Sequence, residues 1–418
     1  MDINELLRGV DCSCGRHHAC DIKCVWVEKG AVAHLTELCR DYKSIILVAD
    51  ENTYGVAGES VEKYAKISRS VIFSGKTVLI PNEEAIDRVT ESLGDSDLII
   101  GIGSGVIQDL CKYVSFNSEI PYYIVATAPS MDGYASTGAA MITGGMKVTY
   151  SAKVPEAIIA DTDFLTTAPL EMIKAGYGDI IGKYSALCDW DIGHIVNGEY
   201  LCPEIYKLTM DMVEKVLPLA EKLLERDAES VKTLMEALVL VGIAMSFAGN
   251  SRPASGSEHH LSHFFEITGI IDDEKYLPHG IDVVYSTYVT SLIREKLINK
   301  KFPDKRFVEE NRDAEIHRVY KSVADGCIAL QKKLGTYEAD RIPAYLEHEE
   351  EIKQLFRNVP SAEEIKTMIE RIGLDMNEFY STYSKDKLRD AIRYAKDLKD
   401  RYTVLWMWYD MFGLEEIL

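Results

Sequence analysis

Hydrophobic positions follow one pattern in the first 165 residues of the chain and a different pattern after them. Up to about residue 165, short runs of β-branched and other apolar residues alternate with stretches in which apolar residues recur at helical spacing. Strands that alternate with helices build parallel sheets, so this part is predicted to be an α/β domain. The expected strands are residues 44–49, 77–80, 97–102 and 122–127, and residues 147–150 and 157–160 are expected to form an added hairpin or edge element.

After residue 163, glycine and β-branched clusters become rare and apolar residues recur three and four positions apart, as in residues 204–224, 230–247 and 281–297. We therefore expect a Rossmann-like domain at residues 1–165 and an all-α domain at residues 166–418. The longest apolar run, residues 237–249, is too short to span a bilayer and is interpreted as a buried helix.

The composition excludes several classes of protein. The chain has 418 residues with 46 Lys and Arg against 67 Asp and Glu, a formal net charge of -21. This charge repels a polyphosphate backbone and no basic stripe offsets it, so nucleic acid is not an expected partner. The N-terminal residues lack the pattern of an export signal, and nine scattered cysteines indicate reduced thiols. We expect a cytoplasmic protein without a membrane span.

A glycine-rich turn between an expected strand and an expected helix is a candidate dinucleotide site. Gly101, Gly103 and Gly105 would let a pyrophosphate approach the backbone and the start of the helix. Asp50 ends an earlier strand, where a carboxylate can accept hydrogen bonds from a ribose and disfavour a 2′-phosphate. The acidic residue precedes the turn instead of following it, which is not the standard Rossmann fingerprint. Nucleotide binding is favoured over a plain strand-to-helix turn.

A second polar loop follows the expected strand at residues 122–127. It carries Thr127, Ser130, Asp132 and Ser136 at the end of a strand, where ligands gather in open α/β sheets. In isolation, an ordinary polar turn would explain these residues equally well.

Histidines in the second half are candidate metal ligands. His259 and His263 lie one helical turn apart, and His279 stands at the start of another expected helix. Asp179 lies in an apolar helix, where a carboxylate is costly unless it is paired or bound to a metal. A lone HxxxH pair is more often structural, and Glu258 precedes the pair instead of lying inside it. The combination with His279 and Asp179 favours a metal site.

The N-terminal segment carries a separate group of cysteines and histidines: Cys12, Cys14, His17, His18, Cys20 and Cys24. Their spacing does not match the CxxC pairs of common zinc sites. We expect reduced thiols in a strand-and-turn element, with a structural metal as the alternative.

Taken together, GIGSGVIQD, TAPSMDGYAS, GYGDIIGKYSALCDW, SRPASGSEHHLSH and LPHGID resemble the sn-glycerol-1-phosphate dehydrogenase family, most closely its bacterial AraM-like branch. This family is part of the glycerol dehydrogenase and dehydroquinate synthase-like superfamily, whose fold is also that of iron-containing alcohol dehydrogenases. The resemblance covers the chain from about Cys12 to the C-terminus and implies reversible, NAD(P)H-dependent reduction of dihydroxyacetone phosphate to sn-glycerol 1-phosphate. It further implies one divalent metal, Zn²⁺ or Ni²⁺, and a homodimer. Asp50 favours NADH over NADPH.

The resemblance also implies roles for individual residues. It makes Asp179, His259 and His279 the metal ligands, and it places His263 and Asp132 at the reacting groups, with His263 as a candidate proton donor. His260 receives no role. The substrate phosphate is assigned to Arg252, and Lys147 is placed near the nicotinamide and the substrate. Lys183, one turn after Asp179, is a second candidate contact to a phosphate or carboxylate, and a simple Asp–Lys helix pair explains it equally well. The expected coenzyme contacts are Asp50, Gly103, Ser104, Gly105, Asp109, Thr127, Ser130, Asp132 and Ser136.

One departure from the family pattern concerns the coenzyme turn. It reads GSG where many superfamily members have GGG, and Ser104 is expected to affect affinity without changing the reaction class. The alternatives are a glycerol or polyol dehydrogenase, a dehydroquinate synthase-like cyclase, and a regulatory protein that binds nucleotide and metal without turnover.

Overall fold

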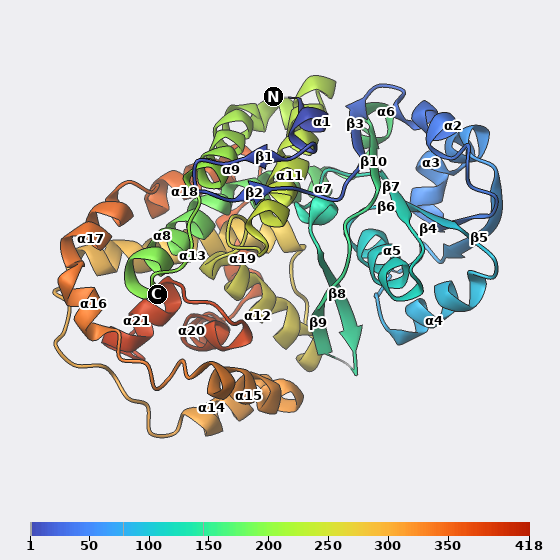
Figure 1. Cartoon of the computed structure of the whole chain (residues 1–418). Coiled ribbons are helices and arrows are strands. Elements are labelled where there is room, and N and C mark those ends of the chain that lie inside the picture. The colour runs from blue at the N-terminus through green and yellow to red at the C-terminus, as the bar shows by residue number, and fades with distance from the viewer. Residues whose placement is uncertain (1, 78, 145) are drawn as a thin grey trace. The chain divides into compact units, whose positions relative to one another are not determined.

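The structure is a computed structural model that describes residues 2–77, 79–144 and 146–418, with the backbone but not the side chains of Met146 and Lys147. The chain forms two compact units, shown in Figure 1. The first unit comprises residues 1–180 and 214–251 (apart from the undescribed positions), and the second comprises residues 181–213 and 252–418. This division differs from the predicted boundary between residues 165 and 166.

The difference has a packing cause. Helix α11 (Ala228–Ala248), which belongs to the helical part of the sequence, packs on the short helix η2 (Gly133–Ala135) of the first unit. A Cβ added at Gly242 would lie 2.8 Å from Cβ of Ala135, and Ser246 Oγ donates to the carbonyl of Ala135 at 2.8 Å. The boundary therefore follows burial of this apolar helix and not the change in periodicity.

The first unit is built on a six-stranded parallel sheet with the order β3-β10-β7-β6-β4-β5. Its strands are β3 (Cys24–Glu28), β4 (Ile45–Asp50), β5 (Ile67–Phe73), β6 (Leu98–Gly103), β7 (Tyr122–Ala126) and β10 (Ala157–Asp161). Alternate residues of β4 and β6, such as Leu47 and Ile100, pack with α3 (Glu51–Tyr64) in one core. Gly101 and Gly103 of β6 lie against α5 (Gly105–Ser118). Helices thus cover both faces of the sheet, as the alternating pattern predicted.

The predicted strands at residues 44–49, 97–102 and 122–127 are confirmed within one or two residues by β4, β6 and β7. The prediction at residues 77–80 is wrong, because the described residues there form no strand and the chain pairs through β5 instead. Sequence patterning missed β5 because it is an edge strand whose polar residues are exposed.

The pair at residues 147–150 and 157–160 is also corrected. Residues 147–150 lie in β9 (Met146–Ser151), which forms an antiparallel hairpin with β8 (Gly138–Thr143), whereas β10 lies inside the large sheet between β3 and β7. Residues 157–160 are all apolar because β10 is buried along its whole length.

The second unit is helical, as predicted. Helices α12 (Ser257–Asp272) and α13 (His279–Asn299) pack closely against each other within it. Its other helices are α8 (Lys183–Asn197), α14 (Arg312–Tyr320), η4 (Lys321–Val323), α15 (Ala324–Leu334), α16 (Ile342–Glu347), α17 (Glu349–Arg357), α18 (Ala362–Arg371), α19 (Met376–Thr382), α20 (Lys385–Tyr394), η5 (Ala395–Leu398) and α21 (Val404–Phe412).

The remaining elements of the first unit are shorter. They are α1 (Ile3–Leu6), the hairpin strands β1 (Val10–Asp11) and β2 (His17–His18), η1 (Ala31–His34), α2 (Leu35–Leu38), α4 (Glu83–Ser92), α6 (Thr162–Leu165), η3 (Leu217–Leu219) and α10 (Ala220–Leu224), while α7 (Leu170–Ile181) and α9 (Pro203–Val216) cross the division.

Helix α11 contains the longest apolar run of the sequence. Among the described helices it is the one long and apolar enough to cross a membrane by length and composition, but 72% of its most apolar window is buried inside the protein. The interpretation of residues 237–249 as part of a buried helix is confirmed, although the helix begins earlier, at Ala228.

Candidate active site

The carboxyl ends of three neighbouring strands carry the predicted coenzyme residues of the first unit. β6 lies between β4 and β7, so Asp50, Gly103 and Thr127 end or follow adjacent parallel strands. The amide of Thr127 donates to the carbonyl of Gly103 at 3.1 Å, and the hydroxyls of Ser104 and Ser130 are hydrogen-bonded to each other. The tertiary structure therefore brings the two loops together at the edge where ligands bind in parallel sheets.

The glycines of the turn differ in whether the packing of α5 on β6 requires them. A Cβ added at Gly103 would lie 2.7 Å from Cβ of Ile107, and one at Gly101 would lie 2.8 Å from Sγ of Cys111, so both allow α5 to pack on β6. At Gly105, by contrast, an added Cβ would meet nothing closer than 3.8 Å. The packing of the protein therefore does not require glycine at residue 105.

Asp50 has two functions available to it. Its Oδ1 accepts from the amides of Asn52 and Thr53 at 2.8 and 2.9 Å, which caps α3. The side chain remains partly exposed at the end of β4. A single carboxylate can therefore cap the helix with one oxygen and offer the other to a ribose.

Asp109 lies one turn into α5 and makes contacts inside the protein. Its carboxylate accepts from Lys112 Nζ at 3.3 Å and from the amide of Ala140 at 3.1 Å. Lys112 is fully buried and also donates to the carbonyls of Gly133 and Gly138 at 3.0 and 2.8 Å, and burial lowers its pKa. Sequence reasoning missed Lys112, which holds the loop containing Ser136 against α5.

The loop that contains Asp132 is held against α7. The amide of Asp132 donates to Oδ2 of Asp179 at 2.9 Å, and both side chains are buried. A Cβ added at Gly176, one turn before Asp179, would lie 1.9 Å from the carbonyl oxygen of Pro129. Glycine is thus required for α7 to approach this loop, and the approach fixes Asp179 beside Asp132.

Three histidines form a cluster in the second unit. The ring centroids of His259 and His279 are 5.1 Å apart, and that of His263 lies 6.2 Å from His259 and 5.5 Å from His279. His259 and His279 each present a ring nitrogen within 4.8 Å of the other. The packing of α12 against α13 therefore brings two imidazoles within reach of one cation.

Glu258 orients His259. Its Oε1 lies 2.6 Å from Nδ1 of His259, so Nδ1–H donates to the carboxylate and Nε2 keeps its lone pair. Glu258 is completely buried, and burial raises the pKa of its carboxyl to about 7. From the sequence, Glu258 was considered only as a residue that does not fit the zincin motif. Its contact with His259 could not be predicted, because contact between adjacent side chains depends on local rotamers.

Arg252 is buried and already strongly bonded. Its Nε and Nη2 donate to the two carboxylate oxygens of Glu199 at 2.8 and 2.5 Å, and Nη1 donates to the carbonyl of Tyr402 at 2.7 Å. Arg401 donates to the carbonyl of Ser255 at 2.9 Å, and burial together with the charge of Arg252 lowers its pKa to about 10. Arg252 and Arg401 thus place two positive charges near this segment, one of them paired with Glu199.

His260 is buried beside this charge. Neither ring nitrogen has a hydrogen-bond partner among the described residues, and burial with the charges of Lys399, Arg401 and Arg252 lowers its pKa well below the usual value. Sequence reasoning gave His260 no role and did not identify Arg401, which lies 149 positions after Arg252 in the sequence.

The two lysines assigned to substrate binding are placed differently. Lys183 is fully buried, and its Nζ donates to the carbonyl of Ala254 at 3.0 Å, which supports the segment after Arg252. The side chain of Lys147 lies outside the described part of the structure. Binding of substrate by either lysine stays a prediction.

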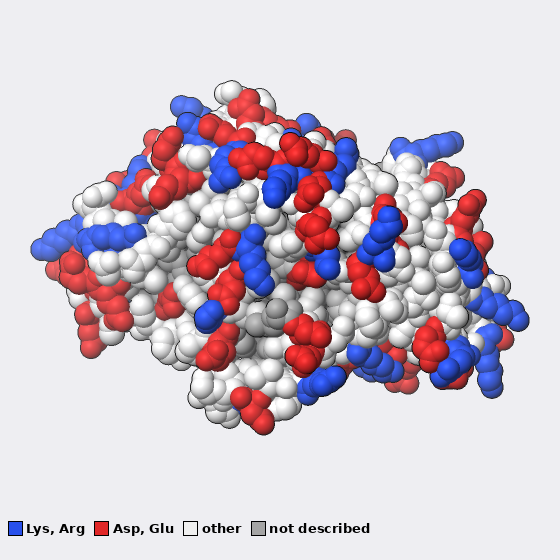
Figure 2. All heavy atoms as spheres, turned by 90° about the horizontal axis from the view of Figure 1, so that it is seen from above, with Lys and Arg blue, Asp and Glu red and all other residues white. Residues whose placement is uncertain are grey.

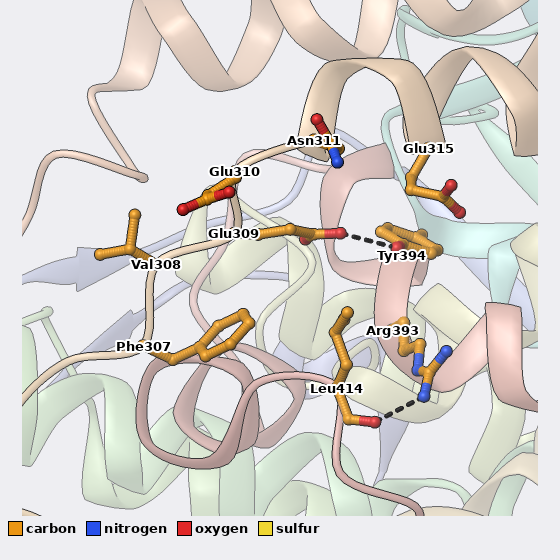
Figure 3. Close-up of a pocket in the computed structure, with 9 residues that line it drawn as sticks. All are labelled: Phe307, Val308, Glu309, Glu310, Asn311, Glu315, Arg393, Tyr394 and Leu414. Atoms are coloured by element: carbon orange, nitrogen blue, oxygen red, sulfur yellow. Dashed lines mark hydrogen bonds between the residues drawn. The ribbon is translucent and has the colours of Figure 1, made fainter.

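A surface hollow of the second unit lies away from the candidate site residues. It is about 410 Å³ in volume, and Figure 3 shows residues 307–311, Glu315, Arg393, Tyr394 and Leu414 around it. Its polar groups bond to one another, as in the contact of Tyr394 Oη with Glu309 at 2.9 Å. None of the candidate site residues lines this hollow.

The face drawn in Figure 2 carries acidic and basic side chains interspersed, without a continuous basic stripe.

Sequence comparisons find a family model and curated relatives of the chain. An iron-containing alcohol dehydrogenase family model matches residues 26–169. A curated glycerol-1-phosphate dehydrogenase (NAD(P)+) of Geobacillus thermodenitrificans is 32% identical over 375 residues, which cover 86% of each chain. The enzyme of the same name from Halalkalibacterium halodurans is 28% identical over 95% of this chain and 94% of its own.

Solved structures share the fold at low identity. A sulfoacetaldehyde reductase from Bifidobacterium kashiwanohense, solved in complex with NAD+, has a TM-score of 0.61 at 14% identity and covers 94% of this chain and 97% of its own. An archaeal alcohol dehydrogenase from a Red Sea brine pool also has a TM-score of 0.61 at 14% identity, covering 90% of this chain and 91% of its own.

Proposed function

The chain belongs to the glycerol-1-phosphate dehydrogenase family, and from that premise we propose that it catalyses the reversible NAD(P)-dependent interconversion of dihydroxyacetone phosphate and sn-glycerol 1-phosphate. The observation that carries this proposal is the 32% identity to a curated enzyme of that name over 86% of both chains. The coenzyme is proposed to bind along the carboxyl ends of β4, β6 and β7, with its pyrophosphate at Gly105 and its adenosine ribose at Asp50.

We propose that Asp179, His259 and His279 hold one divalent metal. Two features of the residues fit such an ion: the ring nitrogens of His259 and His279 converge, and Glu258 fixes the tautomer of His259 that exposes Nε2. One carboxylate and two imidazoles suit Zn²⁺, Ni²⁺ and Fe²⁺, and Zn²⁺ or Ni²⁺ is the proposed ion. When bound, the coenzyme supplies the hydride and the metal stabilises negative charge on the reacting oxygen.

The remaining groups of the proposed site position the substrate and move a proton. His263 lies beside both imidazole ligands and is partly exposed, so one of its ring nitrogens is the proposed donor of the proton to the new hydroxyl. Asp132 is held by the contact of its amide with Asp179 and is proposed to orient the reacting end of the substrate.

The phosphate of the substrate is proposed to bind at Arg252 and Arg401. Arg252 is buried, and its planar guanidinium is suited to bidentate contact with a phosphate dianion. Arg401 adds a second cation, which Arg252 repels. A phosphate dianion bound to both side chains would relieve this repulsion. This arrangement distinguishes a phosphorylated triose from its unphosphorylated analogue.

The decisive experiment follows NADH oxidation by the purified protein with dihydroxyacetone phosphate and, in parallel, with dihydroxyacetone. Turnover that strongly favours the phosphorylated substrate supports the proposal. Equal turnover of both substrates would make the protein a polyol dehydrogenase, and absence of NADH consumption would exclude a dehydrogenase. Elemental analysis of the same sample identifies the metal, light scattering tests the proposed homodimer, and cell fractionation tests the proposed cytoplasmic location.

A further inference from the structure

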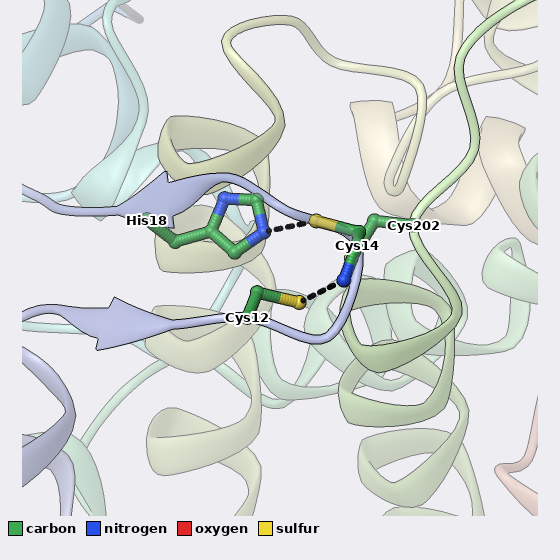
Figure 4. Close-up of side chains that lie close together, drawn as sticks. All are labelled: Cys12, Cys14, His18 and Cys202. Carbon is green, nitrogen blue, oxygen red and sulfur yellow. Dashed lines mark hydrogen bonds between the residues drawn. The ribbon is translucent and has the colours of Figure 1, made fainter.

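The N-terminal hairpin brings together part of the cysteine and histidine group found in the sequence. Strands β1 and β2 pair in antiparallel register, and the turn between them is closed by a bond from the amide of Cys12 to the carbonyl of Arg16 at 3.0 Å. Figure 4 shows Cys12, Cys14 and His18 turned toward one another. Their Sγ and ring nitrogen atoms lie within 4.8 Å of one another.

The hydrogen bonds of His18 prepare it as a ligand. Its Nδ1 lies 3.0 Å from the carbonyl oxygen of Phe247, which can only accept, so Nδ1 carries the proton. Its Nε2 therefore has a lone pair, and this atom lies 3.4 Å from Sγ of Cys14. A histidine whose other ring nitrogen donates to a backbone carbonyl is the usual arrangement in metal sites.

The two cysteines of the cluster are also suited to bind a metal. The amide of Cys14 points at Sγ of Cys12 at 3.5 Å, a contact that stabilises negative charge on this sulfur. Neither residue forms a disulfide. The rest of the sequence group is placed apart: His17 pairs with Asp11 on the exposed side of the hairpin, and burial raises the pKa values of the thiols of Cys20 and Cys24.

We propose that Cys12, Cys14 and His18 bind a structural Zn²⁺ ion. Thiolate and imidazole ligands select zinc over hard cations and are the ligands of structural zinc sites. Binding replaces the thiol protons, which are released to solvent. The ion is distinct from the metal proposed at His259 and His279, because the two sites share no ligand.

The proposed ion would fasten the N-terminal hairpin to the end of α11. His18 stacks on Phe247 with ring centroids 5.6 Å apart and bonds to its carbonyl, while the two cysteines lie in the turn of the hairpin. A hairpin of two-residue strands has little stability by itself. A bound metal would stabilise its folded conformation.

Cobalt substitution of the full-length protein tests the site directly. Thiolate ligands give Co²⁺ a charge-transfer band in the near ultraviolet, which a carboxylate and imidazole site does not produce. We expect this band in the wild-type protein, its loss in C12S/C14S and in H18A, and its retention in H18C, which keeps a ligand at residue 18. Absence of the band in the wild-type protein would overturn the proposal.

Metal content and melting temperature provide independent readouts. We expect zinc content to fall by one equivalent per chain in C12S/C14S, while H279A loses the other metal and keeps the thiolate band. The matched controls C20S and H17A change neighbouring residues outside the cluster and should retain both metals. Unchanged zinc content and melting temperature in C12S/C14S would contradict the site without bearing on the dehydrogenase proposal.

Discussion

The carboxylate of Glu258 lies 2.6 Å from Nδ1 of its sequence neighbour His259, and both side chains are buried. This contact fixes which ring nitrogen of His259 is available to a metal. Outer-shell carboxylates of this kind are worth about 10–100-fold in metal affinity.

We expect Glu258→Gln to weaken metal binding by about this factor, because an amide oxygen accepts the same hydrogen bond without charge. Activity of the variant should recover on addition of the metal, and a titration of activity against metal concentration measures the shift. Glu363→Gln, on the surface of α18, is the control. A Glu258→Gln enzyme with wild-type metal affinity would show that the contact does not tune the ligand.

Removal of a proposed ligand should abolish turnover while the protein remains folded. For Asp179→Ala and His279→Ala we expect a loss of kcat/KM on the order of 10²–10⁴, since the metal contributes several kcal/mol to the transition state. His348→Ala alters a partly exposed histidine paired with Glu351 and should have no effect. Circular dichroism and elemental analysis accompany the assay, and near-normal turnover after exhaustive chelation would refute the metal requirement.

Arg401 and Arg252 should contribute to phosphate recognition separately from general binding. We expect Arg401→Ala to raise KM for dihydroxyacetone phosphate about 10–100-fold, the value of a charged hydrogen bond, with little change for dihydroxyacetone. Arg252→Ala should behave similarly but also lower the melting temperature, because it leaves Glu199 without its bidentate partner. Equal losses on both substrates would assign these arginines a structural role.

Two neighbouring glycines should respond to alanine in opposite ways. Gly103→Ala would place a Cβ against Ile107 and should cost about 1–3 kcal/mol of folding free energy. Gly105→Ala has room for its Cβ and should fold normally, yet we expect a higher KM for NADH because the methyl group would displace the pyrophosphate. Thermal denaturation and steady-state kinetics measure both effects. A Gly105→Ala enzyme with unchanged KM would place the coenzyme elsewhere.

Asp50 offers a test of coenzyme choice that preserves the fold. Asp50→Ser retains a good N-cap for α3 but removes the charge that disfavours a 2′-phosphate. We expect the ratio of kcat/KM for NADPH over NADH to rise by about tenfold. Asp375→Ser makes the same change at the N-cap of α19 and controls for capping. An unchanged ratio would exclude Asp50 from the ribose site.

Periodicity alone predicted much of the fold. The buried strands β4, β6 and β7 consist mainly of apolar residues, about half of them β-branched, and the second half keeps helical spacing. The edge strand β5 was missed because its exposed polar residues carry no such pattern. Periodicity also does not show that α11 packs against η2, which lies nearly a hundred residues earlier.

Residue types and their order determined the family, the reaction class and the candidate ligands, because the chemistry of carboxylates, imidazoles and guanidinium groups is carried by side chains that sequence names directly. The tertiary structure decided which of them meet. It separated Cys12, Cys14 and His18 from three similar residues nearby, paired Arg252 with Glu199, and added Lys112, Glu258 and Arg401. Such contacts depend on rotamers and on packing between distant segments, which sequence spacing does not encode.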